Sequence, residues 1–363
     1  MADDEQKLLL ICPDCPGAGP NDRMRSVLER ALEGVPYDTV TRAAQLQPVH
    51  GRRVLFALPL DEAGMNLEFY AMLHRIRSTP GFFRDSVAAL VVDGQLELYT
   101  KDFGRTIAFA LNQAGCLLIG RPLVEGTGSL RNFDVLAGIH ETDRMGAYLW
   151  SVQDVVQRLR TFAPPRFQAP NLLVLHASSN HKTSNTLALW HMVQPHLTGV
   201  SVRQIDLGNG VVRDCRGCNY ATCLHLGQQN SCFYGGTMVD EVYPAMEQCD
   251  GLLLLCPNYN DALGANLTAC INRLTALYRK AGFQNKYLFA IIVSGYSGGD
   301  IVAKQLISAL NMNKGLLLPG RFALFATANN PGSVCTITEV GEWAQDFAGR
   351  IQRALGGGAA SET

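Results

Sequence analysis

A chain of 363 residues with a formal charge of −1 and 17% charged residues offers no basic face for nucleic acid or for an anionic membrane. Its start, MADDEQK, is acidic and unlike a secretory signal, and no apolar run approaches the roughly 20 residues that cross a bilayer. Eleven cysteines, an odd number, fit a reducing compartment, so we expect a cytoplasmic protein long enough for two domains.

The first half opens with a short apolar strand, Leu8–Ile11, and a proline-rich segment, PDCPGAGPND, that has no hydroxyl side chains. Cys12 and Cys15 form a C-x-x-C pair at this point. Such a pair at a helix start can be redox-active, although two thiols in an ordinary loop are the simpler interpretation. The later loop Asp93-Gly94-Gln95 has no run of glycines. We therefore expect residues 1–163 to keep a folded core but to lack the ligand site that we predict below for the second half, a flavin site.

Residues 164–170 form a proline-rich linker whose Pro164-Pro165 pair cannot continue a helix. After it, strands and helices alternate. The strand candidates are Leu172–Leu175, Val200–Ile205, Gly251–Cys256, Tyr287–Val293 and Arg321–Phe325, and the helix candidates are Thr186–Pro195, Met238–Gln248, Gly264–Lys280, Asp300–Asn311 and Thr338–Leu355. Alternation of this kind predicts an α/β domain with a doubly wound parallel sheet, and five strands suggest the flavodoxin-like order 2-1-3-4-5.

Three pairs of segments repeat along the chain at a nearly constant spacing. Leu58-Pro59 corresponds to Cys256-Pro257, Ala110-Leu111-Asn112 to Ala309-Leu310-Asn311, and Gly120-Arg121 to Gly320-Arg321. The first strands of the two halves lie closer together, which leaves the second half with an insertion, residues 208–236. We therefore predict two tandem flavodoxin-like domains, the second over residues 171–355, and a disordered tail, residues 356–363.

The stretch NLLVLHASSNHKTSNT, residues 171–186, places a loop rich in hydroxyl and amide groups between a buried strand and a helix. A helix start presents free N–H groups and a positive dipole end, and hydroxyl side chains add donors for an anion. No G-x-x-x-x-G-K-[ST] occurs and the loop lacks G-x-G-x-x-G, so the phosphate of flavin mononucleotide (FMN) suits it best. The candidate ligands are Ser178, Asn180, Lys182, Ser184, Asn185 and Thr186. Alternatively, Ser184 only caps the helix.

Two further loops follow the third and fourth strands of this half. In a flavodoxin-like sheet, ligands bind beyond the carboxyl ends of the strands, where the first and third strands diverge. Glycines let the backbone approach a flat ring closely, and a tyrosine can stack on it. The candidate flavin-binding residues are Pro257, Asn258, Tyr259, Asn260 and Asp261 in one loop and Ser294, Gly295, Tyr296, Gly298 and Gly299 in the other.

Residues 171–355 resemble the NADPH-dependent FMN reductases, and within them the iron–sulfur flavoproteins. Ser178 through Ser184-Asn185-Thr186 looks like the family's G-S-x-R-x-x-S-N-T phosphate loop, with Lys182 near its Arg. The stretch CDGLLLLCPNYNDALGANLTACINRL is similar to the family's third strand and following helix, with Pro257 and Tyr259 matched. The resemblance implies FMN as cofactor and NAD(P)H as co-substrate. Because the family pairs as dimers, it also implies that the first half is a built-in partner, or that the chain forms a homodimer.

The insertion contains Cys215, Cys218, Cys223 and Cys232, a C-x2-C-x4-C-x8-C pattern that we call the cysteine quartet. Four thiolates so close in sequence can enclose one iron–sulfur cluster or one zinc ion, or they can be free or disulfide-forming thiols. The resemblance favours a 4Fe-4S cluster, since Met238 keeps the family's distance from the last cysteine. We expect His225 to be a solvated loop residue, and Cys249, Cys256 and Cys270 to be core thiols.

These patterns predict a flavin oxidoreductase in which FMN takes a hydride from NAD(P)H and passes electrons to the cluster or to a small-molecule or protein acceptor. The cofactor supplies the chemistry, so we assign no general acid or base. A non-catalytic electron carrier is one alternative. A zinc-stabilised or cluster-stabilised interaction module of the same fold is another.

Overall fold

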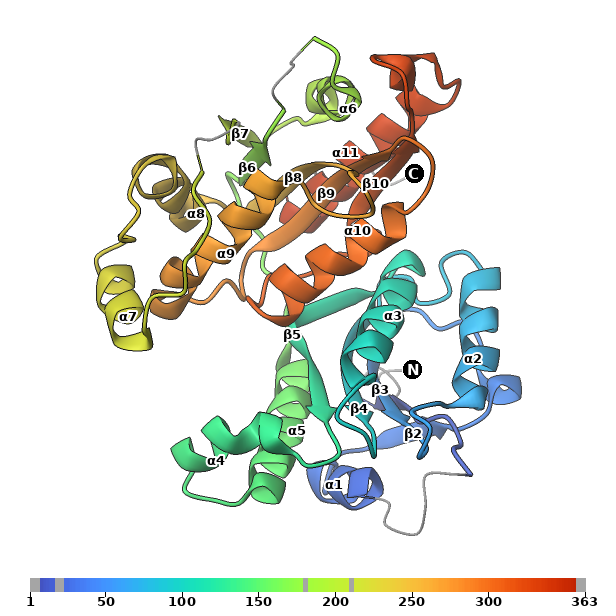
Figure 1. The fold of residues 1–363 in the computed structure, drawn as a ribbon. Coiled ribbons are helices and arrows are strands. Elements are labelled where there is room, and N and C mark those ends of the chain that lie inside the picture. The colour runs from blue at the N-terminus through green and yellow to red at the C-terminus, as the bar shows by residue number, and fades with distance from the viewer. Residues whose placement is uncertain (1–6, 17–22, 179–181, 209–211, 357–363) are drawn as a thin grey trace. The chain divides into compact units, whose positions relative to one another are not determined.

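The computed structural model describes residues 7–16, 23–178, 182–208 and 212–356. The chain divides into two units, Met1–Ala163 and Pro164–Thr363, and each contains one parallel five-stranded sheet (Figure 1). Asn180 and the tail from residue 357 onward lie outside the described residues. No helix in the described ranges has the length and apolar character needed to cross a membrane.

The first sheet has the order β2-β1-β3-β4-β5. Its strands are β1 (Leu8–Ile11), β2 (Tyr37–Val40), β3 (Arg53–Pro59), β4 (Val87–Asp93) and β5 (Leu117–Gly126). The central strands β3 and β4 are almost wholly buried, which is why they consist of continuous apolar residues. The edge strand β2 is partly exposed along its whole length.

Helices cover both faces of the first sheet. They are α1 (Arg23–Ala31), α2 (Leu67–Ser78), α3 (Thr100–Gln113), α4 (Asp134–Ile139) and α5 (Arg144–Thr161). Helix α1 packs against α5, and α2 packs against α3. Between β2 and β3 there is only a short 3₁₀ turn, Ala43–Gln45, so this half has no counterpart of the second half's insertion.

The second sheet has the order β10-β9-β8-β6-β7, which is again 2-1-3-4-5 by position in the domain. Its strands are β6 (Asn171–His176), β7 (Ser201–Asp206), β8 (Gly251–Pro257), β9 (Tyr287–Ser294) and β10 (Ala323–Thr327). The predicted fold class and strand order are confirmed in both halves. The carboxyl ends of β6, β8 and β9 therefore meet at one edge of the sheet.

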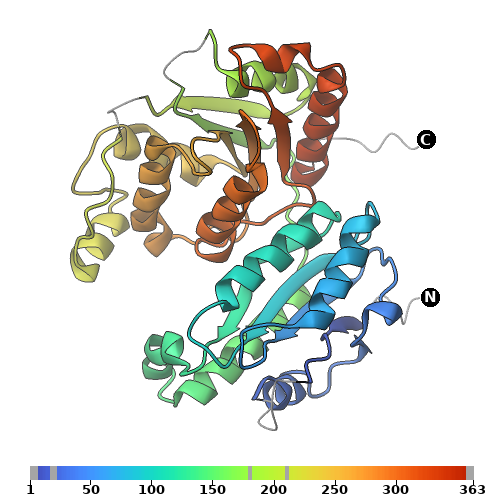
Figure 2. The ribbon, with the colours of Figure 1, turned by 45° about the vertical axis from the view of Figure 1, so that its right-hand side comes forward.

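The helices of the second unit are α6 (Asn185–Val193), α7 (Tyr220–Gln228), α8 (Tyr243–Gln248), α9 (Ala265–Lys280), α10 (Gly299–Leu306) and α11 (Val340–Leu355). Helices α6 and α11 pack side by side on one face of the sheet, and α8, α9 and α10 lie on the other (Figures 1 and 2). Cys249, Cys256 and Cys270 are buried core thiols, as expected.

Three expected elements differ in detail from the structure. The helix expected at Asp300–Asn311 is α-helical only over Gly299–Leu306 and continues as a π-helical segment, Ile307–Met312. The helix expected at Met238–Gln248 begins as a π-helical turn, Met238–Val242, and only Tyr243–Gln248 is α-helical. Pro244 has no N–H to donate to the preceding turn, which interrupts the α-helical hydrogen bonds there. The last strand starts at Ala323 and not at Arg321, which has a left-handed φ of 55° and lies outside the pairing with β9.

The insertion contains a helix for which the sequence analysis had no candidate. Helix α7 lies within it and carries both Cys223 and His225, so the expectation of a loop histidine was wrong. The helix starts at a side-chain cap, in which the Thr222 N–H donates to Asn219 Oδ1 over 2.8 Å. Gly227 lets α7 cross α9 closely, since a Cβ at that glycine would lie 2.3 Å from the Ala276 carbonyl oxygen.

Matching contacts in the two units support a duplicated domain. Arg121 and Arg321, which the repeats pair, both have left-handed φ angles, 52° and 55°. In each unit an arginine of the last helix donates to carbonyls at this point. Arg158 reaches the Gly120 oxygen at 2.7 Å, and Arg350 reaches the Arg321 oxygen. Each of these arginines also pairs with an aspartate one helical turn earlier on its own helix.

Candidate functional site

The loop after β6 brings three hydroxyl groups together at the start of α6. Ser184 Oγ lies 3.1 Å from Ser178 Oγ and 2.9 Å from Thr186 Oγ1. Ser184 also accepts the Leu187 N–H at 3.3 Å, so it caps the helix in addition to joining the hydroxyl group. Lys182 is exposed beside them. This arrangement combines hydroxyl donors with the positive end of a helix dipole, which favours an anion.

Asn185 fixes this loop to the segment that follows β10. Its Nδ2 donates to the carbonyl oxygens of Ala328 and Asn330 at 3.1 and 2.9 Å, and its Oδ1 accepts the Val334 N–H at 3.2 Å. The side chain therefore holds two loops of the same sheet edge together. These contacts give Asn185 a structural role. The ligand role that the sequence suggests for Asn185 stays a prediction.

Buried His176, at the end of β6, is part of a hydrogen-bond network below the loop, and the sequence analysis did not predict a role for it. Its Nε2 lies 3.0 Å from Gln204 Nε2, and the Trp190 indole N–H donates to Gln204 Oε1 at 2.9 Å. Since the indole occupies the Gln204 oxygen, the Gln204 amide donates to His176, whose Nε2 must then be the unprotonated acceptor. The network fixes the backbone from which the hydroxyl-rich loop starts.

The loop after β8 is a tight turn. Asn260 and Asp261 have φ angles of 54° and 58°, and Tyr259 and Ala262 exchange backbone hydrogen bonds around them. Two successive left-handed residues define a type I′ turn, for which Asn and Asp are suited. The turn leaves the Tyr259 ring 63% exposed at the sheet edge.

Asn258 connects this turn to the loop after β9. Its Nδ2 donates to Ser294 Oγ at 3.1 Å, to the Ser297 carbonyl at 2.9 Å and to Asp261 Oδ1 at 3.3 Å. Its Oδ1 is buried and accepts no hydrogen bond from the part of the chain that the structure describes. A buried orphan acceptor costs free energy unless a ligand donor reaches it.

The loop after β9 is shaped by glycines. A Cβ on Gly295 would lie 2.9 Å from Asn329 Oδ1, and one on Gly298, whose φ is 82°, would lie 1.9 Å from Asp261 Oδ1. Gly299 begins α10, and the Tyr296 ring is 83% exposed. Pro257 is the last residue of β8. The predicted site residues after β6, β8 and β9 that the structure describes therefore gather at one edge of the sheet.

The cysteine quartet lies over helix α9. Asn272 of α9 donates to Asp214 Oδ1 at 2.9 Å, next to Cys215, and Arg273 donates to the Gly235 oxygen at 2.8 Å, near Cys232. Arg279 lies over the Tyr220 ring at 4.5 Å, at the start of the helix that carries Cys223. Residues of α9 thus contact the described part of the insertion near Cys215, near Cys232 and at the start of α7.

The four thiols are close enough to influence one another. Burial raises the pKa of Cys223, the positive charge of Arg279 lowers it, and the charges of the other three quartet thiolates raise it further. Within the described ranges, however, no three His, Cys, Asp or Glu side chains are arranged to hold a single metal ion.

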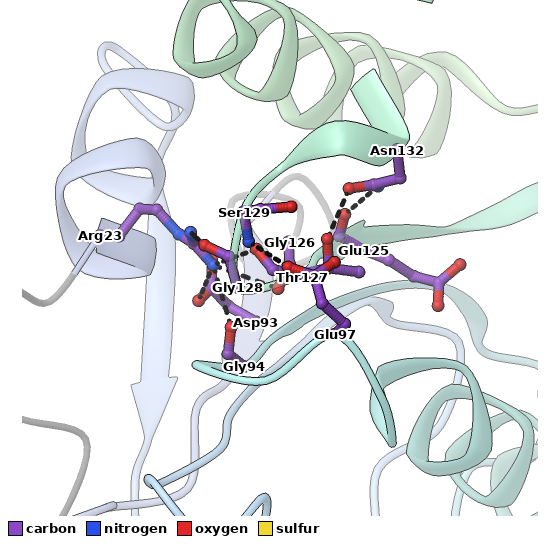
Figure 3. Close-up of polar contacts among 10 residues, drawn as sticks. All are labelled: Arg23, Asp93, Gly94, Glu97, Glu125, Gly126, Thr127, Gly128, Ser129 and Asn132. Carbon is purple, nitrogen blue, oxygen red and sulfur yellow. Dashed lines mark hydrogen bonds and ion pairs between the residues drawn. The ribbon is translucent and has the colours of Figure 1, made fainter. Parts of the chain in front are cut away.

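The corresponding edge of the first sheet is closed by an arginine (Figure 3). Arg23, the first residue of α1, forms a two-point ion pair with Asp93 at the end of β4, with distances of 2.8 and 3.0 Å. Its guanidinium also donates to carbonyl oxygens of the loops after β4 and β5, those of Gly94, Gly126, Thr127 and Gly128. At the position that Asn185 takes in the second unit, the first unit thus has a charged side chain, and each of its three guanidinium nitrogens donates a hydrogen bond within the domain.

Comparison with known proteins finds a family match within the second unit. Residues 170–330 match the family model described as NADPH-dependent FMN reductase. No curated protein matches the chain. Similar solved structures include RosB with bound 8-demethyl-8-formylriboflavin-5'-phosphate, at 12% identity and a TM-score of 0.42, covering 52% of this chain and 79% of that one.

Two further similar structures are an FMN-dependent NADH-azoreductase from Bacillus anthracis and an NAD(P)H:quinone oxidoreductase from Methanothermobacter marburgensis. The first has 12% identity and a TM-score of 0.34, covering 50% of this chain and 99% of that one. The second has 14% identity and a TM-score of 0.37, covering 53% and 98%. Similarity at this level adds nothing to the family match. The family match therefore covers residues 170–330, within the second unit.

Proposed function

We propose that the second unit is an NAD(P)H-dependent FMN oxidoreductase whose flavin binds at the carboxyl edge of its sheet. The observation that supports this most is the hydroxyl group of Ser178, Ser184 and Thr186 at the start of α6, inside the segment that matches the FMN reductase family. In this proposal these hydroxyls and Lys182 bind the phosphate of FMN. The loops after β8 and β9 receive the flavin ring.

Asn258 and the two exposed tyrosines have distinct roles in this proposal. The orphan Oδ1 of Asn258 accepts a hydrogen bond from a ligand N–H, which fits the polar edge of a flavin. Tyr259 and Tyr296 offer aromatic faces against which a flat ring can stack. Gly295 and Gly298 keep the backbone free of side chains where the ring approaches.

When bound, FMN supplies the redox chemistry, taking a hydride from NAD(P)H and releasing electrons to an acceptor. The chain supplies binding, orientation and exclusion of water. We propose as the acceptor a 4Fe-4S cluster held by the cysteine quartet, or a small molecule. Support for the cluster comes from the C-x2-C-x4-C-x8-C spacing of the quartet and from its place beside α9, whose Arg273 and Arg279 contact the insertion.

The decisive experiment is an anaerobic titration of the flavin-stripped full-length protein with FMN, followed by addition of NADPH or NADH. We expect quenching of the flavin fluorescence on binding and bleaching of the flavin absorption after the nicotinamide is added. Binding without bleaching would favour the non-catalytic electron carrier, and no binding at all would refute the proposal.

A single substitution tests the phosphate loop. Thr186→Val removes one hydroxyl from the group around Ser184 while keeping the shape of the side chain. A hydrogen bond to a charged group contributes about 1.5–3 kcal/mol, so the Kd for FMN should rise roughly tenfold to a hundredfold. The matched control is Thr268→Val on the exposed face of α9, which should leave the Kd unchanged.

The built-in-partner role of the first half and a homodimer both remain predictions, which sedimentation with and without FMN would check.

A further inference from the structure

A buried histidine lies below the hydroxyl-rich loop. His176 ends β6 and is only 1% exposed. Its ring nitrogen Nε2 lies 3.0 Å from the amide nitrogen of Gln204, and its Nδ1 lies 3.5 Å from Asp206 Oδ1 and 3.4 Å from the backbone nitrogen of Ser178. A neutral imidazole carries one proton, so one of its two nitrogens donates and the other accepts.

The indole of Trp190 decides which ring nitrogen carries that proton. An indole N–H only donates, and here it donates to Gln204 Oε1 at 2.9 Å. The NH2 group of Gln204 therefore faces His176 and needs an acceptor, so Nε2 is unprotonated and the proton lies on Nδ1. A doubly protonated ring is disfavoured for the same reason, because its Nε2–H would meet the NH2 group of Gln204.

On the other side of the ring, the Nδ1 proton has an acceptor but the Ser178 N–H does not. Nδ1–H faces the carboxylate of Asp206, which the Gly208 N–H also holds in place at 2.9 Å. The Ser178 N–H points at Nδ1, which cannot accept it while protonated, and no other described residue accepts it. Since backbone donors in folded proteins are normally paired, this N–H points to an acceptor that a ligand supplies.

We propose that His176 is a positioning residue for the phosphate of FMN, because its Nδ1–H tautomer leaves the Ser178 N–H available to a phosphate oxygen. This inference rests on the proposed function. Ser178 already belongs to the hydroxyl group, with its Oγ 3.1 Å from Ser184 Oγ, so the N–H lies at the residue where the phosphate is expected. The opposite tautomer would accept the Ser178 N–H and compete with the phosphate for it.

The first measurement is ¹⁵N NMR of the histidine rings in the flavin-stripped full-length protein at pH 7. Protonated and unprotonated ring nitrogens differ widely in chemical shift, and we expect His176 to show a protonated Nδ1 and an unprotonated Nε2. The backbone amide signal of Ser178 should then shift when FMN is added and stay in place when riboflavin, which lacks the phosphate, is added. A protonated Nε2, or an amide that responds equally to both flavins, would overturn the inference without any variant.

A paired substitution reverses the tautomer at constant net charge. Gln204→Glu places a carboxylate oxygen opposite Nε2, and Asp206→Asn removes the carboxylate opposite Nδ1, so the proton should move to Nε2. We expect the Kd for FMN to rise by about tenfold or more while the Kd for riboflavin stays the same. The matched control is Gln153→Glu with Asp154→Asn on α5 of the first unit, which should leave both Kd values unchanged.

The outcomes separate this inference from the proposed function. A variant whose tautomer is reversed by NMR, but whose ratio of FMN to riboflavin affinity equals that of the wild type, would overturn the role of His176 while the flavin site stands. Wild-type protein that binds neither flavin would overturn the proposed function and the role of His176 together. Circular dichroism reports whether the paired variant folds, and the wild-type NMR measurement carries the test if it does not.

Discussion

The ion pair between Arg23 and Asp93 should be the largest single polar contribution to the stability of the first domain. Both side chains are mostly buried, with exposed fractions of 21% and 11%, and the guanidinium also holds the loops after β4 and β5 (Figure 3). Removing one partner of a buried pair typically costs about 3–5 kcal/mol, since the other charge stays behind. We therefore expect Arg23→Met to lower the free energy of unfolding of this domain by about that amount.

Hydrogen exchange read by mass spectrometry measures this effect in the full-length protein, because peptides of β4 and β8 report on the two domains separately. Exchange protection in β4 should fall about a hundredfold to several thousandfold, and protection in β8 should not change. Arg25→Met is the matched control on the same helix, where an exposed pair with Glu29 should cost less than about 0.5 kcal/mol. Replacing Arg23 by Met and Asp93 by Leu together should cost less than Arg23→Met alone. If Arg23→Met and Arg25→Met have equal effects, the reasoning is refuted.

Two further predictions concern the second domain. Gly298→Ala should weaken FMN binding by more than tenfold, because the new Cβ would lie 1.9 Å from Asp261 Oδ1 at a φ of 82°. In the control Gly341→Ala the new Cβ meets nothing within 4 Å, so the Kd for FMN should not change. Stability should also fall as pH rises above 9. Burial raises the pKa of Cys270 from 9.0 to about 12, so in this range the unfolded chain holds fewer protons than the folded one, and the free energy of unfolding falls by up to about 1.36 kcal/mol per pH unit. The urea midpoint should depend less steeply on pH in Cys270→Val than in the wild type. The exposed control Cys335→Ser should keep the wild-type pH dependence. A wild-type pH dependence in Cys270→Val would contradict the prediction.

The sheets could be predicted because their signal is local. Strands such as Gly251–Pro257 and Tyr287–Ser294 are buried on both faces, so each is a continuous apolar run that the sequence displays directly. The alternation of these runs with helical segments then leaves few topologies, since crossovers between parallel strands are right-handed. The error at the last strand came from Arg321, whose left-handed backbone no composition rule reveals.

The candidate site could be located from the sequence, but not its internal connections. The loops after β6, β8 and β9 were expected at one edge because parallel strands point the same way. That Asn258 would bind both Asp261 and Ser294, or that Gln204 would orient His176, depends on contacts between distant segments. Helix α7 was not among the predicted helices, although Asn219 is a recognisable helix cap.

The two domains show which parts of the duplicated fold tolerate change. The arginines of the last helix, Arg158 and Arg350, still bind the backbone near the fifth strand in both copies. At the opposite edge, the first residue of the first helix is Arg23 in one copy and Asn185 in the other, and each binds the loop after the fifth strand.

The charge of the first residue of the first helix affects which ligands the carboxyl edge of each sheet can bind. In the second domain this residue is the neutral Asn185, which adds no charge at the start of α6, where we propose that an anion binds. The fourth strand of that sheet ends in Ser294, whose hydroxyl accepts a hydrogen bond from Asn258. In the first domain the guanidinium of Arg23 is committed to Asp93, and that carboxylate would repel a phosphate or the electron-rich edge of a flavin. Exchanging Arg23 for Asn alone would therefore leave the carboxylate in place. We would expect the first domain to bind a flavin only if Asp93 were also neutralised and hydroxyl side chains were introduced into the segment after β1.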